Sequence, residues 1–112
     1  MSNTAIDLEH LARQTGGDIA LERELLVLFS QQCARHLRTI HGSADDNARR
    51  DAAHTLKGAA RAIGAWQVAD AADLIEQQLA APGSHPQEAS MDALTLAAAE
   101  ARAAIARFDC AA

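Results

Sequence analysis

Hydrophobic positions recur every three or four residues along most of the chain. Between residues 18 and 40 they are Leu21, Leu25, Leu28, Phe29, Cys33, Leu37 and Ile40. This spacing gathers apolar side chains on one face of an α-helix. Comparable rows predict further helices over about 45–62, 65–80 and 87–108. A shorter amphipathic helix is expected over about 4–14, with Thr4 as its cap.

Glycine, proline and small polar residues separate these segments. Gly16-Gly17 breaks the chain after the short helix, His41-Gly42-Ser43 ends the long one, and Gly64 follows the next. The run Pro82-Gly83-Ser84-His85-Pro86 is the longest linker. Asp18 opens the first long helix, and Asp45 or Ser43 caps the second. With no strand pattern and no internal repeat, residues 1–112 are predicted to form one all-α domain. Its architecture is an up-down-up-down antiparallel four-helix bundle, closed at one end by the short helix.

Composition narrows the classes of function. Alanine is abundant, whereas there are two Phe, one Trp and no Tyr, which favours closely packed helices. The net charge of −5 argues against a general nucleic-acid binder. No run approaches the ~20 apolar residues that cross a bilayer, and the first residues lack a signal core. Two cysteines fit a reducing compartment. We therefore expect a cytoplasmic, monomeric protein that binds neither membrane nor nucleic acid.

The segment 45–62 carries the candidate chemistry, because His54 is central to its polar face. The polar-face neighbours within roughly 60° of it are Asn47, Arg50, Asp51, Lys57, Gly58 and Arg61. Gly58 costs a helix about 1 kcal/mol relative to alanine, which this chain uses freely elsewhere. Its presence therefore suggests that space beside His54 is needed. Lys57 is the single lysine among nine arginines, and it provides a compact, flexible charge.

The run from His54 to Gly64, H-T-L-K-G-A-A-x-x-I-G, resembles the signature of histidine-containing phosphotransfer (HPt) domains, H-x-[LI]-K-G-[SAG]-[SAG]-x-x-[ILVF]-G. The resemblance implies a four-helix bundle and a freestanding phosphoryl carrier. In that reading His54 accepts a phosphoryl group from a receiver-domain phosphoaspartate, or from a kinase, and passes it to a response-regulator receiver. Imidazole suits the task because its ordinary pKa near 6.5 leaves it largely neutral and nucleophilic.

The resemblance also assigns roles to the neighbours of His54. The family places a carboxylate or amide 22 residues after the histidine, and Glu76 occupies that offset. We expect Nδ1 of His54 to face Glu76 and Nε2 to be phosphorylated. Lys57 would offset phosphoryl charge, and Gly58 would admit the loops of the partner. Arg50 and Arg61 would extend the docking surface.

The sequence lacks the features of an ATP-dependent enzyme. It contains no glycine-rich phosphate-binding signature and no pair of aspartates suited to Mg²⁺. We therefore expect no cofactor in this chain and no autonomous kinase activity. The Mg²⁺ should belong to the receiver domain of the partner, either a hybrid histidine kinase or a response regulator.

Two other classes of function stay open. The first is an HPt-like docking or inhibitory module that binds a kinase or receiver without being phosphorylated, although such a module would not need the His-Lys-Gly set. The second is a helical bundle that binds haem or a di-metal centre, but Glu-x-x-His pairs and a haem attachment sequence are missing. Cys33 and His36 lie one turn apart and make a poor metal pair. Trp66 is expected to pack the end of the bundle. The histidines assigned no role are His10, His36, His41 and His85.

Overall fold

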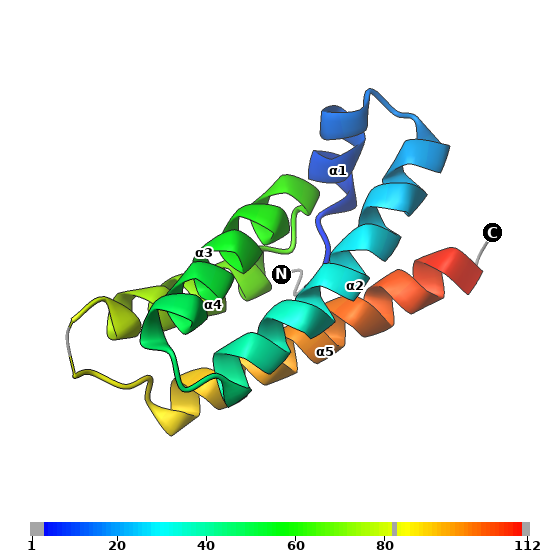
Figure 1. Cartoon of the computed structure of the whole chain (residues 1–112). Helices are drawn as coiled ribbons and strands as arrows, with labels where there is room; N and C mark the ends of the chain where they lie inside the picture. Colours follow the sequence, from blue (N-terminus) through cyan, green and yellow to red (C-terminus); the bar gives the residue numbers. More distant parts are fainter. Residues whose placement is uncertain (1–3, 82, 111–112) are drawn as a thin grey trace.

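The protein is built from helices alone within the part of the chain that the computed structural model describes, residues 4–81 and 83–110. The helices are α1 (Leu8–Thr15), α2 (Ile19–Gly42), α3 (Asp46–Ile63), α4 (Trp66–Ala80) and α5 (Glu88–Cys110) (Figure 1). The all-α prediction is confirmed, and each long helix begins and ends close to its expected bounds. Pro82, part of the predicted break before the last helix, lies outside the described residues.

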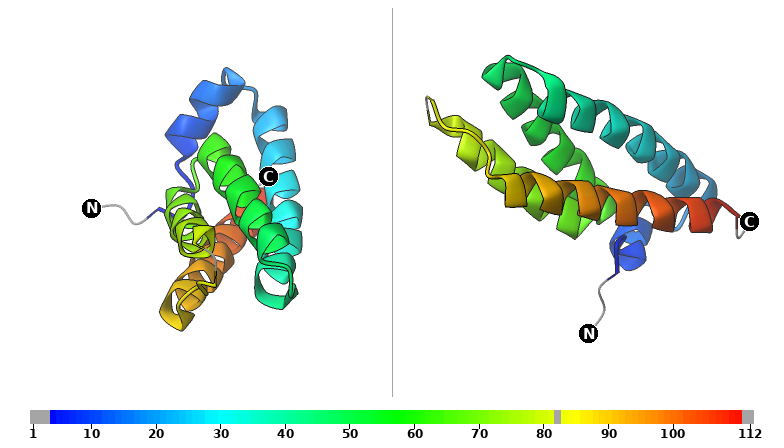
Figure 2. Two further views of the ribbon diagram at one scale, coloured as in Figure 1. Left: turned by 60° about the vertical axis from the view of Figure 1, so that its left-hand side comes forward. Right: turned by 90° about the horizontal axis from the view of Figure 1, so that it is seen from below.

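The four long helices form a closed ring of contacts. Helix α2 packs against α3 and α5, and α4 packs against the same two helices. In Figure 1 the chain reverses direction at each connection between consecutive long helices. Helix α1 contacts α2 and α3 and lies at one end of the elongated body (Figure 2). Helix α3 therefore has three neighbours, α1, α2 and α4, whereas α4 is held between α3 and α5.

Aspartate side chains begin the first three helices. Asp7 accepts a hydrogen bond from the backbone N–H of His10 at 3.0 Å. Asp18 and Asp45 cap α2 and α3 in the same way. The expected cap at Thr4 is wrong, because Asp7 satisfies a free N–H of the first turn and α1 therefore begins at Leu8. Of the two candidates for α3, Asp45 is the cap.

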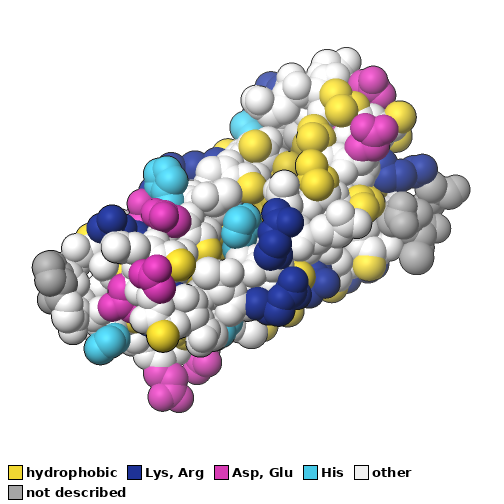
Figure 3. Space-filling model, viewed as in Figure 1, with side chains coloured by type: hydrophobic (Ala, Val, Ile, Leu, Met, Phe, Trp, Pro, Cys, Tyr) yellow, Lys and Arg dark blue, Asp and Glu magenta, His cyan; other side chains and the backbone are white. Residues whose placement is uncertain are grey.

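The buried row of α2 differs from the predicted one. Leu26, Phe29 and Cys33 are fully buried, whereas Leu21 and Leu28 are 37% and 47% exposed. At about 100° per residue, Leu21 and Leu28 lie roughly 140–160° around the helix from Leu26. A spacing of three or four residues therefore grouped positions from nearly opposite sides of α2 into one predicted row. Figure 3 shows hydrophobic side chains gathered at the surface over α1 and the first half of α2.

A junction of polar contacts ties the start of α1 to the corner between α3 and α4. The N–H of Asp7 donates to the carbonyl of Gly64 at 2.9 Å, and Nε1 of Trp66 donates to Oδ2 of Asp7 at 3.0 Å. The Trp66 hydrogen bond is the main cause that lowers the pKa of the Asp7 carboxyl, followed by the N–H of His10. His10 packs edge-on against Trp66 with ring centroids 4.8 Å apart. Trp66 thus packs the end of the bundle as expected, although 41% of it stays exposed.

The corner itself requires glycine. Gly64 has a φ of 82°, which L-residues rarely adopt, and it ends α3 in the left-handed conformation. A Cβ at this position would lie 2.8 Å from the carbonyl oxygen of Asp7 and 2.9 Å from its Cβ. The backbone of Asp7 could not yield without losing its hydrogen bond to Gly64. Close approach and backbone conformation therefore both select glycine.

A pair of alanine substitutions tests this difference between two glycines of α3 and its cap. Gly64→Ala should lower the free energy of unfolding by about 2 kcal/mol or more, because it adds a clash to a strained φ. Gly58→Ala is the matched control: a Cβ there meets nothing within 4 Å. It should raise the free energy of unfolding by up to about 1 kcal/mol. Urea denaturation measures both values, and equal effects would contradict the assignment.

No helix within the described residues combines the length and the apolar content needed to cross a membrane.

Candidate functional site

Helix α3 holds His54 out into solvent. The residues that precede and follow it on the inner face, Ala53 and Leu56, are completely buried. That burial fixes the rotation of the helix, so the imidazole of His54 projects from the opposite side with 67% of its side chain exposed. The ring is therefore open to a second protein.

Helix α4 supplies a carboxylate to one nitrogen of the ring. Ile75 and Leu79 are buried in the core, which leaves Glu76 at the edge of α4 that faces α3. Oε2 of Glu76 lies 2.9 Å from Nδ1 of His54. The Glu76 side chain is 22% exposed. The expected contact across 22 residues of sequence is present.

The charge on Glu76 decides which ring nitrogen carries the hydrogen. The ammonium of Lys57 is the main cause that lowers the pKa of the Glu76 carboxyl below its ordinary 4.5, with a smaller contribution from the His54 hydrogen bond, and together they outweigh desolvation. Glu76 is therefore ionised near neutral pH and can only accept. Glu76 therefore favours the neutral imidazole that carries its hydrogen on Nδ1, and in that form Nε2 keeps a free lone pair on the exposed side of the ring.

Lys57 lies between two carboxylates of α4. Its Nζ is 2.7 Å from Oε1 of Glu76 and 3.1 Å from Oδ1 of Asp73, and only 15% of the side chain is exposed. Glu76 first, and then Asp73, raise the pKa of Lys57 above 10.5. Asp73 is a residue of this site that was not predicted from the sequence. The available signal was its position one turn before Glu76, on the same face of the predicted helix.

A shallow hollow of about 480 Å³ opens beside His54. The residues that line it are Arg50, Asp51, His54, Lys57, Asp73, Glu76, Gln77 and Ala80. Of the site residues predicted from sequence, the hollow brings together Arg50, Lys57 and Glu76 with His54. Arg61 lies exposed farther along α3 and does not line the hollow, although its carbonyl accepts from Nε2 of His10 at 3.0 Å. His10 thus has a structural contact that the sequence did not reveal.

Gly58 lies on the exposed face of α3, one turn after His54. A Cβ built on it would have no neighbour within 4 Å. Close packing between helices therefore does not explain this glycine, and its φ is ordinary. Because Gly58 has no side chain, nothing projects from the surface at this position beside His54.

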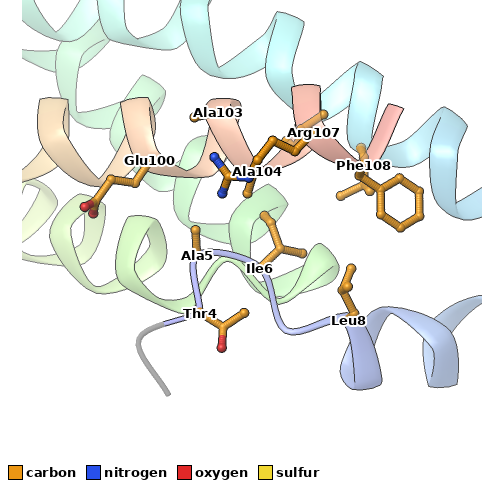
Figure 4. Close-up of a pocket in the computed structure, with 11 residues that line it drawn as sticks. Thr4, Ala5, Ile6, Leu8, Glu100, Ala103, Ala104, Arg107 and Phe108 are labelled. Atoms are coloured by element: carbon orange, nitrogen blue, oxygen red, sulfur yellow. The ribbon is translucent and has the colours of Figure 1, made fainter. Parts of the chain in front are cut away.

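A second hollow, of about 600 Å³, lies between the segment before α1 and the last turns of α5 (Figure 4). Its lining is mainly apolar, with Glu100 and Arg107 the charged residues among those that line it. It contains no histidine or cysteine, so its lining offers no nitrogen or sulfur nucleophile. The chemistry is therefore assigned to the hollow at His54.

The described residues contain no group of three or more His, Cys, Asp or Glu side chains placed to hold a metal ion. Cys33 is completely buried, and this burial raises the pKa of its thiol above 9.0. A thiol in that state is a poor ligand and a poor nucleophile.

Comparison with known families decides what kind of domain this is. The family model of the Hpt domain matches residues 24–104. The chain belongs to the Hpt domain family. Hpt domains are phosphotransfer modules of two-component systems, act as phosphoryl carriers rather than kinases, and interact with receiver domains. No curated protein and no solved structure was found to match the chain.

The matched span contains the whole of the candidate site of this Hpt domain. It covers most of α2, all of α3 and α4, and most of α5. His54 and Glu76 both fall inside it. Asp7 and helix α1 precede the matched span, whereas their partners Gly64 and Trp66 lie inside it.

The lowered pKa of Glu76 predicts how its contribution to stability varies with pH. A carboxyl with a lowered folded-state pKa stabilises the fold above its ordinary pKa, here 4.5, and loses this contribution as the pH falls through the lower value. The difference in free energy of unfolding between wild type and Glu76→Gln should therefore be constant near neutral pH and shrink below about pH 4.5. Urea denaturation across this range measures it. Glu24→Gln, on the exposed face of α2, controls for the loss of one charge, and an equal pH profile for both variants would contradict the prediction.

Proposed function

We propose that this Hpt domain accepts a phosphoryl group on Nε2 of His54 and passes it on. The donor is the phosphoaspartate of a receiver domain, or a histidine kinase, and the acceptor is the receiver domain of a response regulator. One observation carries the proposal: Nδ1 of His54 is engaged by Glu76, so Nε2 is left as the exposed nucleophilic nitrogen. The His-Lys-Gly pattern at residues 54–58 supports it.

The chemistry follows from that hydrogen bond. The Nε2 lone pair attacks phosphorus, the P–O bond to the donor aspartate breaks, and the aspartate leaves as a carboxylate. The ring still carries hydrogen on Nδ1, so it becomes positively charged. Glu76 accepts that hydrogen bond and stabilises the charge, as the buried aspartate of a serine-protease triad does for its histidine. In the return step the P–N bond breaks and neutral imidazole leaves, so the transfer is reversible.

The neighbours of His54 would serve the approach of the partner. Gly58 leaves room on the exposed face for the loops that surround the donor aspartate. Lys57 keeps Glu76 ionised. It also lies three residues after His54 on α3, where its charge would balance that of the phosphoryl group after transfer. Arg50, in the hollow, and Arg61, farther along α3, would meet acidic groups on the receiver. The Mg²⁺ that assists the reaction would be bound by the receiver.

Transfer from a phosphorylated receiver domain tests the assignment. Wild type should acquire label that is stable in base and labile in acid, as expected for phosphohistidine. His54→Gln should acquire none, because the residues that line the hollow include no second histidine to replace the nitrogen. His85→Gln, which removes an exposed histidine from the linker before α5, is the matched control and should be labelled like wild type.

The same experiment separates the carrier from a docking or inhibitory module. The protein is a docking module if the wild type is never labelled and if the wild type and His54→Ala bind the receiver with equal affinity. If His54→Gln is labelled like wild type, the phosphoacceptor is another residue.

A further inference from the structure

A chain of polar contacts extends from His54 to a second acid on α4. His54 contacts Glu76, Glu76 contacts Lys57, and Lys57 contacts Asp73. The two carboxylate oxygens of Glu76 have different partners: Oε2 contacts the imidazole of His54, and Oε1 contacts the ammonium of Lys57. The charge of Lys57 is therefore divided between two carboxylates, and only one of them touches His54.

Asp73 is held in place from both sides. Its Oδ1 accepts from Nζ of Lys57 at 3.1 Å, and its Oδ2 accepts from Nε2 of Gln77 at 2.7 Å. Gln77 follows Asp73 by four residues, the separation at which side chains meet on a helix. Two bonds to two oxygens fix the carboxylate, so it offers Lys57 a stationary partner.

We infer that Asp73 is a positioning residue for phosphotransfer. Asp73 shares the positive charge of Lys57 with Glu76. Less of the negative charge of Glu76 is then offset, so Glu76 remains a strong acceptor for the Nδ1–H of His54. This inference rests on the proposed function for its effect on transfer, but its first consequence concerns the unphosphorylated ring. Without the charge of Asp73, Lys57 pairs with Glu76 alone and offsets more of the negative charge of the Glu76 carboxylate. The hydrogen bond to Nδ1 weakens, so a larger fraction of neutral rings carries its hydrogen on Nε2, where it blocks the nucleophilic lone pair.

The first measurement is the ring tautomer of His54 in the unphosphorylated protein. Correlation spectra of the ¹⁵N-labelled ring at about pH 8, where an ordinary imidazole is neutral, distinguish the two forms. Wild type should show hydrogen on Nδ1, and Asp73→Asn should show a larger fraction with hydrogen on Nε2. Asp73→Glu should restore most of the wild-type pattern. Asp70→Asn, which removes an equal charge from an exposed position of the same helix, should leave it unchanged.

The second measurement is phosphorylation by phosphoramidate, a small donor that needs no partner protein. Nε2–P forms, the P–N bond of the donor breaks and ammonia leaves. Asp73→Asn should lower the rate about two- to fivefold, the range that a partly exposed ion pair supports. Asp70→Asn should react like wild type, and Asp73→Glu should recover most of the loss.

The outcomes separate this inference from the proposed function. A tautomer in Asp73→Asn no different from that in Asp70→Asn overturns the role of Asp73, whatever the transfer assay gives. A slower rate without a change of tautomer also overturns it, because the loss then has another origin. Absence of phosphohistidine in wild type, with the tautomer shifted as expected, overturns the proposed function alone. If Asp73→Asn does not fold, Gln77→Ala releases Oδ2 of Asp73 and should shift the tautomer in the same direction by a smaller amount; no shift there overturns the inference.

Discussion

The hydrogen bond between His54 and Glu76 depends on how closely α3 and α4 pack. Helices α3 and α4 are in contact along their length and bury small residues, Ala53 on α3 and Ala69 and Ala72 on α4. Small side chains let helix axes approach, and the polar residues at the edge then come within hydrogen-bond distance. The alanine-rich composition is therefore part of how the site is built.

Charge at the site is arranged in a sequence of alternating sign. A cation lies between two anions, and the anion nearer the imidazole has one oxygen left for the ring. This order keeps Glu76 ionised and still available as an acceptor. A cation that contacted Glu76 alone would secure its charge but weaken it as a partner for His54.

Much of this structure was readable in the sequence. Helical periodicity predicted the helices, and the resemblance to HPt domains, which place a carboxylate or amide 22 residues after the histidine, predicted the contact between His54 and Glu76. Asp73 was not predicted, because a lone aspartate on a helix edge resembles any solvated carboxylate until the position of Lys57 is known. Leu26 was missed for a related reason: α2 packs against α1, α3 and α5 and so has a wide apolar face, and spacing alone does not locate its centre. The contacts of His10 and Trp66 depend on how α1 folds back, which no local pattern specifies.

The junction at Asp7 has a consequence for the geometry at the other side of the corner. Trp66 is the first residue of α4, and α4 begins without a side-chain cap of its own. Its indole is tied to Asp7, whose backbone is tied to Gly64. An α-helix is regular, so the orientation of its first residue determines the directions in which later side chains point. The hydrogen bond from Trp66 to Asp7 therefore also helps to orient Glu76. The start of α1 thereby contributes to the rotation of α4 about its own axis, although it lies far from His54 in the sequence.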